Sequence, residues 1–334
     1  MAHSLLVIRG MSRIGIAASL FAFAVPASAS PVGGASVDTT FIEVSGVIGG
    51  TAVPAGKWPD AVAVLGQGAC TGTLIAPDVV LTAGHCADMV PTQVIANSLD
   101  HSGQGGITAT VKSTTAYPNW ETSYDVAVIV LDAPITGVTP RKIGTACTFT
   151  EGFGDSKMVH LVGFGLTDTA GQGNNTKLNE AMAPVTDADC SGPGGCTTGV
   201  SPGGEFIAGG GGKDSCFGDS GGPVYLDTPR GAVVVGAVSR GLDGAATPCG
   251  GGGIYVRTDK IVQWLETTTG KTIEKDLCAT GGGEEPGGEE PGGNDPSGGG
   301  APGDISGGCS TSGGSSGAGL LLIGLALVRR RRRV

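Results

Sequence analysis

Three residues of this sequence stand in settings that suit nucleophilic catalysis. Ser220 lies in the run GDSGGP, His85 in the run LTAGHC, and Asp125 opens the apolar run DVAVIVL. A serine hydroxyl is a weak nucleophile until a base takes its proton, and a histidine base needs a carboxylate to fix its tautomer. The three residue types therefore predict covalent catalysis by a serine, provided that the fold brings them together.

The local context of each residue fits this chemistry. Glycines on both sides of Ser220 leave backbone N–H groups free to turn toward a developing oxyanion. The carboxylate of Asp125 leads directly into an apolar run, where a buried charge is costly unless it is paired. Taken singly, a serine turn, a histidine at a strand end and an aspartate cap are common, so the prediction depends on the combination.

The elements that must position these residues are predicted to be strands. Short β-branched runs alternate with Gly, Pro, Asp and Asn through the middle of the chain, with almost no long period of 3.6 residues. The clearest runs are 61–65, 79–81, 126–131, 159–162 and 232–238. This pattern indicates an all-β domain of sandwich or barrel type. One helix is predicted over 258–266, where apolar residues share a broad face.

The amino-terminal residues predict export. Residues 1–29 combine basic residues, an apolar run at 14–25 and the small-residue end Ala27-Ser28-Ala29, which is typical of a signal peptide. Outside the cytosol disulfides persist. The alternative use of cysteine is zinc binding, but the sequence has no C-x-x-C pair and few histidines. The cysteines between Cys70 and Cys278 are therefore predicted to form four disulfides, which can pair in roughly a hundred ways.

The net charge is −10, and residues 47–278 hold 13 Lys and Arg against 22 Asp and Glu. This acidic balance argues against nucleic acid as a partner, because such a partner calls for a basic face. Residues 279–306, rich in Gly, Pro and Glu, are predicted to be a flexible linker. Residues 307–334 contain Cys309, a short apolar stretch and five arginines, and this tail resembles the MYXO-CTERM sorting signals of myxobacterial surface proteins. The resemblance implies that sorting machinery processes and anchors the chain at Cys309. The alternative is a disordered end.

GDSGGP and TAGHC, with the chain order His, Asp, Ser, resemble the chymotrypsin/trypsin family of serine peptidases over about residues 47–266. The resemblance implies two six-stranded antiparallel β-barrels with a C-terminal helix and a site between the barrels. Ser220 would be the nucleophile, His85 the general base and then acid, and Asp125 the residue that orients His85. The N–H groups of Gly218 and Ser220 would form the oxyanion hole. No cofactor and no metal, including calcium, is expected.

The run VIGG, which begins at Val47, looks like the new N-terminus that the family's zymogens release on activation. Its α-ammonium would pair with Asp219 and order the oxyanion loop, and residues 30–46 would be a propeptide. Gly46 precedes the cleavage point, whereas trypsin activators cleave after Arg or Lys. A separate activating protease is therefore an expected partner.

Asp214 stands at the family's substrate-pocket position, and Gly241 and Gly253 match the glycines that keep this pocket open. A carboxylate there implies a preference for Arg or Lys at P1; the alternative is a solvated loop aspartate. Backbone groups of Ser239 and Gly241 would hold the substrate as an added strand. Arg240 replaces the usual aromatic residue, which leaves the P2 to P4 preference open.

The resemblance also implies how the cysteines pair. The implied bridges are Cys70–Cys86, Cys216–Cys249 and Cys190–Cys196, with Cys147 and Cys278 left as the fourth pair. The domain at 47–278 is thus predicted to be an exported serine endopeptidase, at the cell surface or extracellular, that acts on proteins or peptides through an acyl-enzyme. The alternative is a surface-displayed binding protein with a catalytically silent protease fold. An exported esterase is less favoured, because GDSGGP is not the G-x-S-x-G elbow.

Overall fold

The computed structural model describes residues 47–278, apart from positions 104, 174, 193–195, 197–199, 201 and 202. The predicted signal peptide, propeptide, linker and sorting tail, with Cys309, lie outside the described residues. Within the part of the chain that is described, no helix has the length and apolar character that a membrane span requires.

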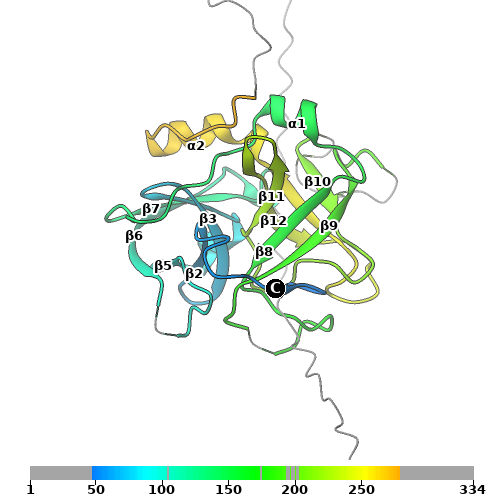
Figure 1. Ribbon diagram of the computed structural model, residues 1–334, viewed down its shortest axis with the longest axis horizontal. Coiled ribbons are helices and arrows are strands. Elements are labelled where there is room, and N and C mark those ends of the chain that lie inside the picture. Colours follow the sequence, from blue (N-terminus) through cyan, green and yellow to red (C-terminus); the bar gives the residue numbers. More distant parts are fainter. Residues whose placement is uncertain are drawn as a thin grey trace, which may run out of the picture. The chain divides into compact units, whose positions relative to one another are not determined.

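Six strands close into a first antiparallel barrel, drawn in blue to cyan in Figure 1. The order around the barrel is β2-β3-β4-β7-β6-β5, and β5 pairs with β2 to close it. The strands are β2 Ala61–Leu65, β3 Ala69–Ala76, β4 Val79–Thr82, β5 Gln93–Ala96, β6 Ile107–Ala116 and β7 Ala127–Leu131. Val62 and Val64 point into this barrel, whereas Ala61 and Ala63 join an apolar cluster that includes second-barrel residues. Successive side chains point to opposite faces, so both faces of β2 are buried.

A second antiparallel barrel follows, drawn in green to yellow in Figure 1. Its order is β9-β10-β13-β12-β11-β8, closed by the pairing of β8 with β9, and the short β1, Thr51–Ala52, adds to β9. The strands are β8 Met158–Gly163, β9 Asn179–Asp187, β10 Glu205–Ala208, β11 Pro223–Thr228, β12 Gly231–Gly241 and β13 Gly253–Arg257. The expected pair of six-stranded barrels is confirmed.

The helix predicted over 258–266 is present after β13, but in two parts. A 3-10 turn, η3 Thr258–Lys260, precedes α2, Val262–Thr269, which ends at Gly270 with a left-handed φ of 65°. The fully buried Leu265 of α2 belongs to the apolar cluster between the barrels, and Trp264 lies against Tyr117 with ring centroids 5.0 Å apart. The end of the domain is thereby held against the first barrel.

A second helix, α1, Ala146–Gly152, is absent from the sequence predictions. Its residues include β-branched threonines and a cysteine, which have low helix propensity. Its stability comes from tertiary contacts: Thr148 Oγ1 donates to Asp276 Oδ2 at 3.0 Å, and Cys147 is bonded to Cys278.

The described residues contain four disulfides: three are the pairs that the family resemblance implies, and the fourth joins the two cysteines that were left over. They join Cys70 to Cys86, Cys147 to Cys278, Cys190 to Cys196 and Cys216 to Cys249. The bridge from Cys147 spans 131 residues of sequence and encloses the second barrel. Closing a long loop restricts the unfolded chain, and a native bridge is worth about 2 to 4 kcal/mol. Such bridges fit an oxidising, extracellular environment.

Asp60, which is fully buried before β2, links the two barrels. Its carboxylate accepts hydrogen bonds from Arg141 Nε at 3.0 Å and from Tyr225 Oη, on β11, at 2.6 Å. Trp58 stacks on Tyr225 with ring centroids 4.3 Å apart. Burial raises the pKa of Tyr225 well above its usual value, so this hydroxyl remains a donor.

Replacing Arg141, the cation that contacts the buried Asp60, should lower the stability of the protein considerably. Arg141→Met would leave Asp60 buried without a counter-charge, and we expect the free energy of unfolding to fall by about 3 to 5 kcal/mol. Urea denaturation followed by fluorescence measures the change. Lys57→Met is the matched control, because its ion pair with Glu180 is at a partly exposed lysine and is worth less than about 1 kcal/mol. Equal losses in the two variants would contradict the role of Asp60.

Candidate active site

His85 and Asp125 meet because the strands that carry them are paired. His85 follows β4 and begins the 3-10 turn η1, His85–Met89, whereas Asp125 precedes β7. Thr82 lies opposite Ala127 in the β4–β7 ladder, so the end of one strand and the start of the other share an edge. His85 Nδ1 lies 2.9 Å from Asp125 Oδ2, and the His85 backbone N–H donates to Asp125 Oδ1 at 3.0 Å.

The second barrel contributes a further hydrogen bond to this carboxylate. Ser239 Oγ, on β12, donates to Asp125 Oδ2 at 2.8 Å. Burial alone would raise the pKa of Asp125, but its contacts with His85 and Ser239 outweigh burial and hold the pKa below its usual value. Asp125 is therefore an ionised acceptor, which fixes His85 with its proton on Nδ1 and leaves Nε2 as a base.

Ser220 lies in the loop before β11, and this loop rests on the first barrel. The Thr71 N–H donates to Ser220 O at 2.9 Å, and Thr71 Oγ1 donates to Gly218 O at 2.8 Å. Gly221 has a φ of 77°, and a Cβ there would overlap Thr82 Oγ1. Gly221 is thus required both by its backbone conformation and by the close approach of β4.

Ser220 and His85 line one pocket of about 550 Å³. Between Ser220 Oγ and His85 Nε2, both of which are described, there is no hydrogen bond, although such bonds often tighten only when substrate binds. The N–H groups of Gly218 and Ser220 donate to no described residue, so they are available for an acceptor in this pocket.

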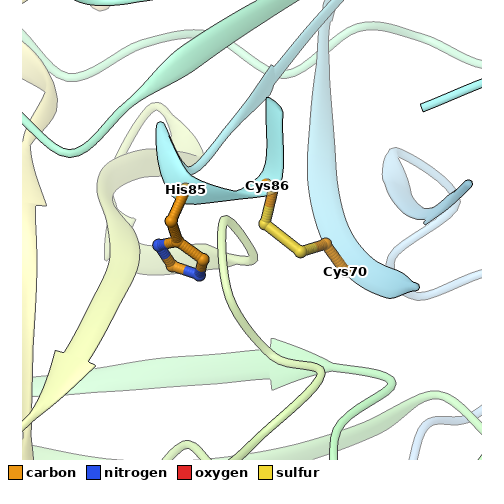
Figure 2. Close-up of side chains that lie close together, drawn as sticks. All are labelled: Cys70, His85 and Cys86. Atoms are coloured by element: carbon orange, nitrogen blue, oxygen red, sulfur yellow. A yellow bond between two sulfur atoms is a disulfide. The ribbon is translucent and has the colours of Figure 1, made fainter. Parts of the chain in front are cut away.

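A disulfide lies directly beside the candidate base. Figure 2 shows the imidazole of His85 next to Cys86, which is bridged to Cys70 on β3. The three side chains are close enough to suggest metal ligands, but a metal would need thiolates, and both sulfurs are committed to the disulfide. The bridge ties η1 to the barrel and so restrains the position of His85.

The residues predicted for the substrate pocket divide into two groups. Ser239 and Gly241 line the pocket, whereas Asp214 and Gly253 lie next to Ser215, which lines it. Asp214 is 2% exposed, and its Oδ2 accepts the N–H groups of Gly250 and Gly252. Its Oδ1 has no hydrogen-bond partner among the described residues. Burial raises the pKa of Asp214, and no ion pair neutralises this carboxylate among the described residues.

Asp219 is also buried and accepts only backbone hydrogen bonds in the described structure. Gly165 N–H donates to its Oδ1 and Cys216 N–H to its Oδ2, each at 2.8 Å. Burial raises its pKa to about 7. Val47, the predicted activation terminus, is fully buried in the second-barrel core of this uncleaved chain, and Ile48 pairs with Asp214 by a β-bridge.

The structure adds pocket-lining residues that the sequence predictions missed. Four side chains, Met89, Trp120, Phe217 and Pro248, make the pocket wall largely apolar. Arg240 also lines the pocket, and it forms an ion pair with the fully buried Glu205. Phe217 could have been noticed from its place beside Gly218, but Glu205 is 35 residues from Arg240 in a different strand.

Comparison with known proteins agrees with this geometry. The family model described as Trypsin matches residues 47–265. The chain belongs to the trypsin family. It is 29% identical to "Brachyurin" of Leptuca pugilator over 237 residues, which cover 68% of this chain and 100% of that relative. It is also 29% identical to "Trypsin 5G1" of Aedes aegypti over 239 residues, covering 67% and 85% of the two chains. This trypsin-family protein is therefore a serine endopeptidase.

The raised pKa of Asp219 predicts how stability depends on pH before processing. An unfolded aspartate ionises near 3.8, whereas folded Asp219 keeps its proton up to a pKa of about 7. The folded state thus binds more protons, and the free energy of unfolding should fall by about 2 to 4 kcal/mol as the pH rises through this window. Asp219→Asn should remove that fall in urea titrations between pH 4 and pH 8.

The control for this titration is Asp132→Asn, at an exposed carboxylate. This variant should keep the pH dependence of the parent chain. An unchanged slope in Asp219→Asn would show that another group is responsible.

Proposed function

We propose that this peptidase cleaves peptide bonds through a triad of Ser220, His85 and Asp125. The observation that carries the proposal is the hydrogen bonding of His85 to the buried, ionised Asp125 within the pocket that also contains Ser220. A base with a fixed tautomer beside a serine in a pocket is the arrangement that nucleophilic catalysis requires.

Each step then uses one group of the site. Nε2 of His85 takes the proton of Ser220 Oγ as Oγ bonds to the carbonyl carbon, and the N–H groups of Gly218 and Ser220 bind the resulting oxyanion. The imidazolium gives its proton to the leaving amine as the peptide bond breaks, which leaves an acyl-enzyme. Water, deprotonated by the same Nε2, then releases the acid and restores Ser220.

We further propose a preference for Arg or Lys at P1. The supporting observation is the unpaired Oδ1 of Asp214, a buried carboxylate beside the pocket residue Ser215. A buried carboxylate with raised pKa is stabilised in its ionised form by an incoming cation. Because Asp214 does not itself line the pocket, the P1 side chain has to reach past Ser215 to meet it.

Export and activation complete the proposal. Residues 1–29 would direct export, and another protease would remove residues 30–46 after Gly46. The new α-ammonium of Val47 would then give Asp219 the cation that it lacks. The tail at 307–334 would hold the peptidase at the cell surface through processing at Cys309.

Labelling with a serine-directed fluorophosphonate tests the nucleophile and the activation together. The exported protein should be labelled on Ser220, and N-terminal sequencing of the labelled protein should begin at Val47. Ser220→Ala should abolish the label and lower turnover by at least about 10⁴-fold. Label that persists in this variant would overturn the triad, and label on protein that still begins at Ser30 would overturn the activation step. The intact mass reports whether Cys309 is modified.

Paired ester substrates test the pocket. The parent enzyme should hydrolyse an Arg ester faster than a Phe ester. Asp214→Ser should lower kcat/KM for the Arg ester by about 10²- to 10³-fold, because a buried charge pair is lost, and change the Phe ester much less. Faster hydrolysis of the Phe ester by the parent enzyme would refute the basic preference.

A further inference from the structure

A buried ion pair includes Arg240, the residue that follows Ser239, whose hydroxyl donates a hydrogen bond to Asp125. Arg240 Nη1 donates to Glu205 Oε1 at 2.6 Å and Nη2 donates to Oε2 at 3.1 Å, which makes the contact bidentate. Glu205 on β10 is fully buried, and the Arg240 side chain on β12 is 29% exposed. Burying two charges costs free energy, so the net stabilisation from such a pair depends on good geometry and on further hydrogen bonds.

The pair makes one of those further bonds to the candidate site. Arg240 Nη1 also donates to Ser239 Oγ at 3.1 Å. Adjacent side chains on a strand normally point to opposite faces, but β12 is irregular here: Val238 lies opposite Tyr255, and Arg240 lies opposite Ile254. Ser239 is the extra residue of this bulge, and a bulge re-aims side chains. The irregularity lets two neighbours, Ser239 and Arg240, reach each other.

Glu205, Arg240, Ser239 and Asp125 form a series of hydrogen bonds in which the donor and acceptor of each bond are fixed. A guanidinium donates and never accepts, and an ionised carboxylate accepts and never donates. Ser239 Oγ must therefore accept from Arg240 and give its only proton to Asp125. Glu205 holds the guanidinium of Arg240 through two hydrogen bonds. Because the guanidinium is fixed as a donor to Ser239 Oγ, the Ser239 hydroxyl has no alternative orientation to the one that donates to Asp125.

We infer that Arg240, held by Glu205, is a positioning residue of the triad, which acts through Ser239 to orient and stabilise the carboxylate of Asp125. This inference rests on the proposed triad. It also gives a role to the arginine that replaces an aromatic residue at this position. Without Arg240, the Ser239 hydroxyl is free to rotate, and Asp125 loses part of its hydrogen bonding.

The loss of Arg240 has a predictable effect on His85, because His85 contacts the Asp125 carboxylate. A less stabilised Asp125 carboxylate is a stronger base, so it favours the imidazolium form of the histidine that it contacts. The groups that face Asp125 are His85 from η1 and, through Ser239, Arg240 from β12 and Glu205 from β10. The adjacent Tyr124 stays neutral, because burial raises its pKa. Replacing both members of the ion pair avoids leaving either charge buried alone.

The test is a proton NMR titration of His85 in the full chain, together with the pH dependence of kcat/KM. In the double variant Glu205→Gln, Arg240→Gln, the midpoint of His85 should rise by about half a pH unit or more, and the acid limb of kcat/KM should move with it. We expect kcat to fall about tenfold, since His85 is held less well for proton transfer. Near-UV circular dichroism checks that the variants are folded.

Ser239→Ala provides the coupling control. If the ion pair acts through this hydroxyl, the same double replacement in the Ser239→Ala background should give no further shift of the His85 midpoint. Arg230→Gln is the matched control for losing a bidentate arginine pair, here with Asp276, and it should lower stability without moving the His85 titration.

The outcomes separate this inference from the proposed function. A shift that is absent, or equal with and without the Ser239 hydroxyl, overturns the positioning role of Arg240. Failure of the proposed function would show instead as parent enzyme that does not react with the fluorophosphonate at Ser220. The NMR titration does not require turnover, so it tests the positioning role of the ion pair whether or not the parent enzyme reacts at Ser220.

Discussion

The hydrogen bonds that meet at Asp125 hold the candidate site together. The first barrel supplies this carboxylate and His85, and the second barrel supplies Ser239 and the loop that carries Ser220. Because Asp125 is 7% exposed, its charge is satisfied by protein groups from both barrels rather than by water. The apolar layer that packs the two barrels together therefore sets the geometry of the site.

Two other carboxylates near Ser220 are buried with raised pKa values, and neither has a cation among the described residues. Asp214 holds one oxygen unpaired, and Asp219 accepts only backbone N–H groups. The charge of Asp214 is itself one cause of the raised pKa of Asp219. A cation that neutralises either carboxylate thus makes the other easier to ionise. Under the proposed function, substrate binding at Asp214 and activation at Asp219 would therefore be electrostatically linked.

Much of the fold could be predicted from residue patterns, but not the way in which the strands pair. Alternation and turn residues located β2, β4, β7, β8 and β12 to within a few residues. Closure into two barrels was implied by the family resemblance, because local periodicity does not specify partners distant in sequence. Helix α1 was missed for the same reason, since Asp276 and Cys278 stabilise it from the far end of the domain.

The residues of the candidate site likewise divide into those that local motifs could identify and those that only the folded structure reveals. Distinct motifs pointed to His85, Asp125 and Ser220, whereas nothing local marks Glu205 as the partner of Arg240, and sequence spacing could not reveal that Asp214 lies outside the pocket lining.

The bond between Cys147 and Cys278 has a mechanical consequence. A pull between the chain beyond Cys278 and the first barrel passes through the disulfide to α1. The backbone between the two cysteines forms a covalent loop that this direct path bypasses. The strands of the second barrel lie within this loop, so such a pull cannot draw them out one after another while the disulfide is intact.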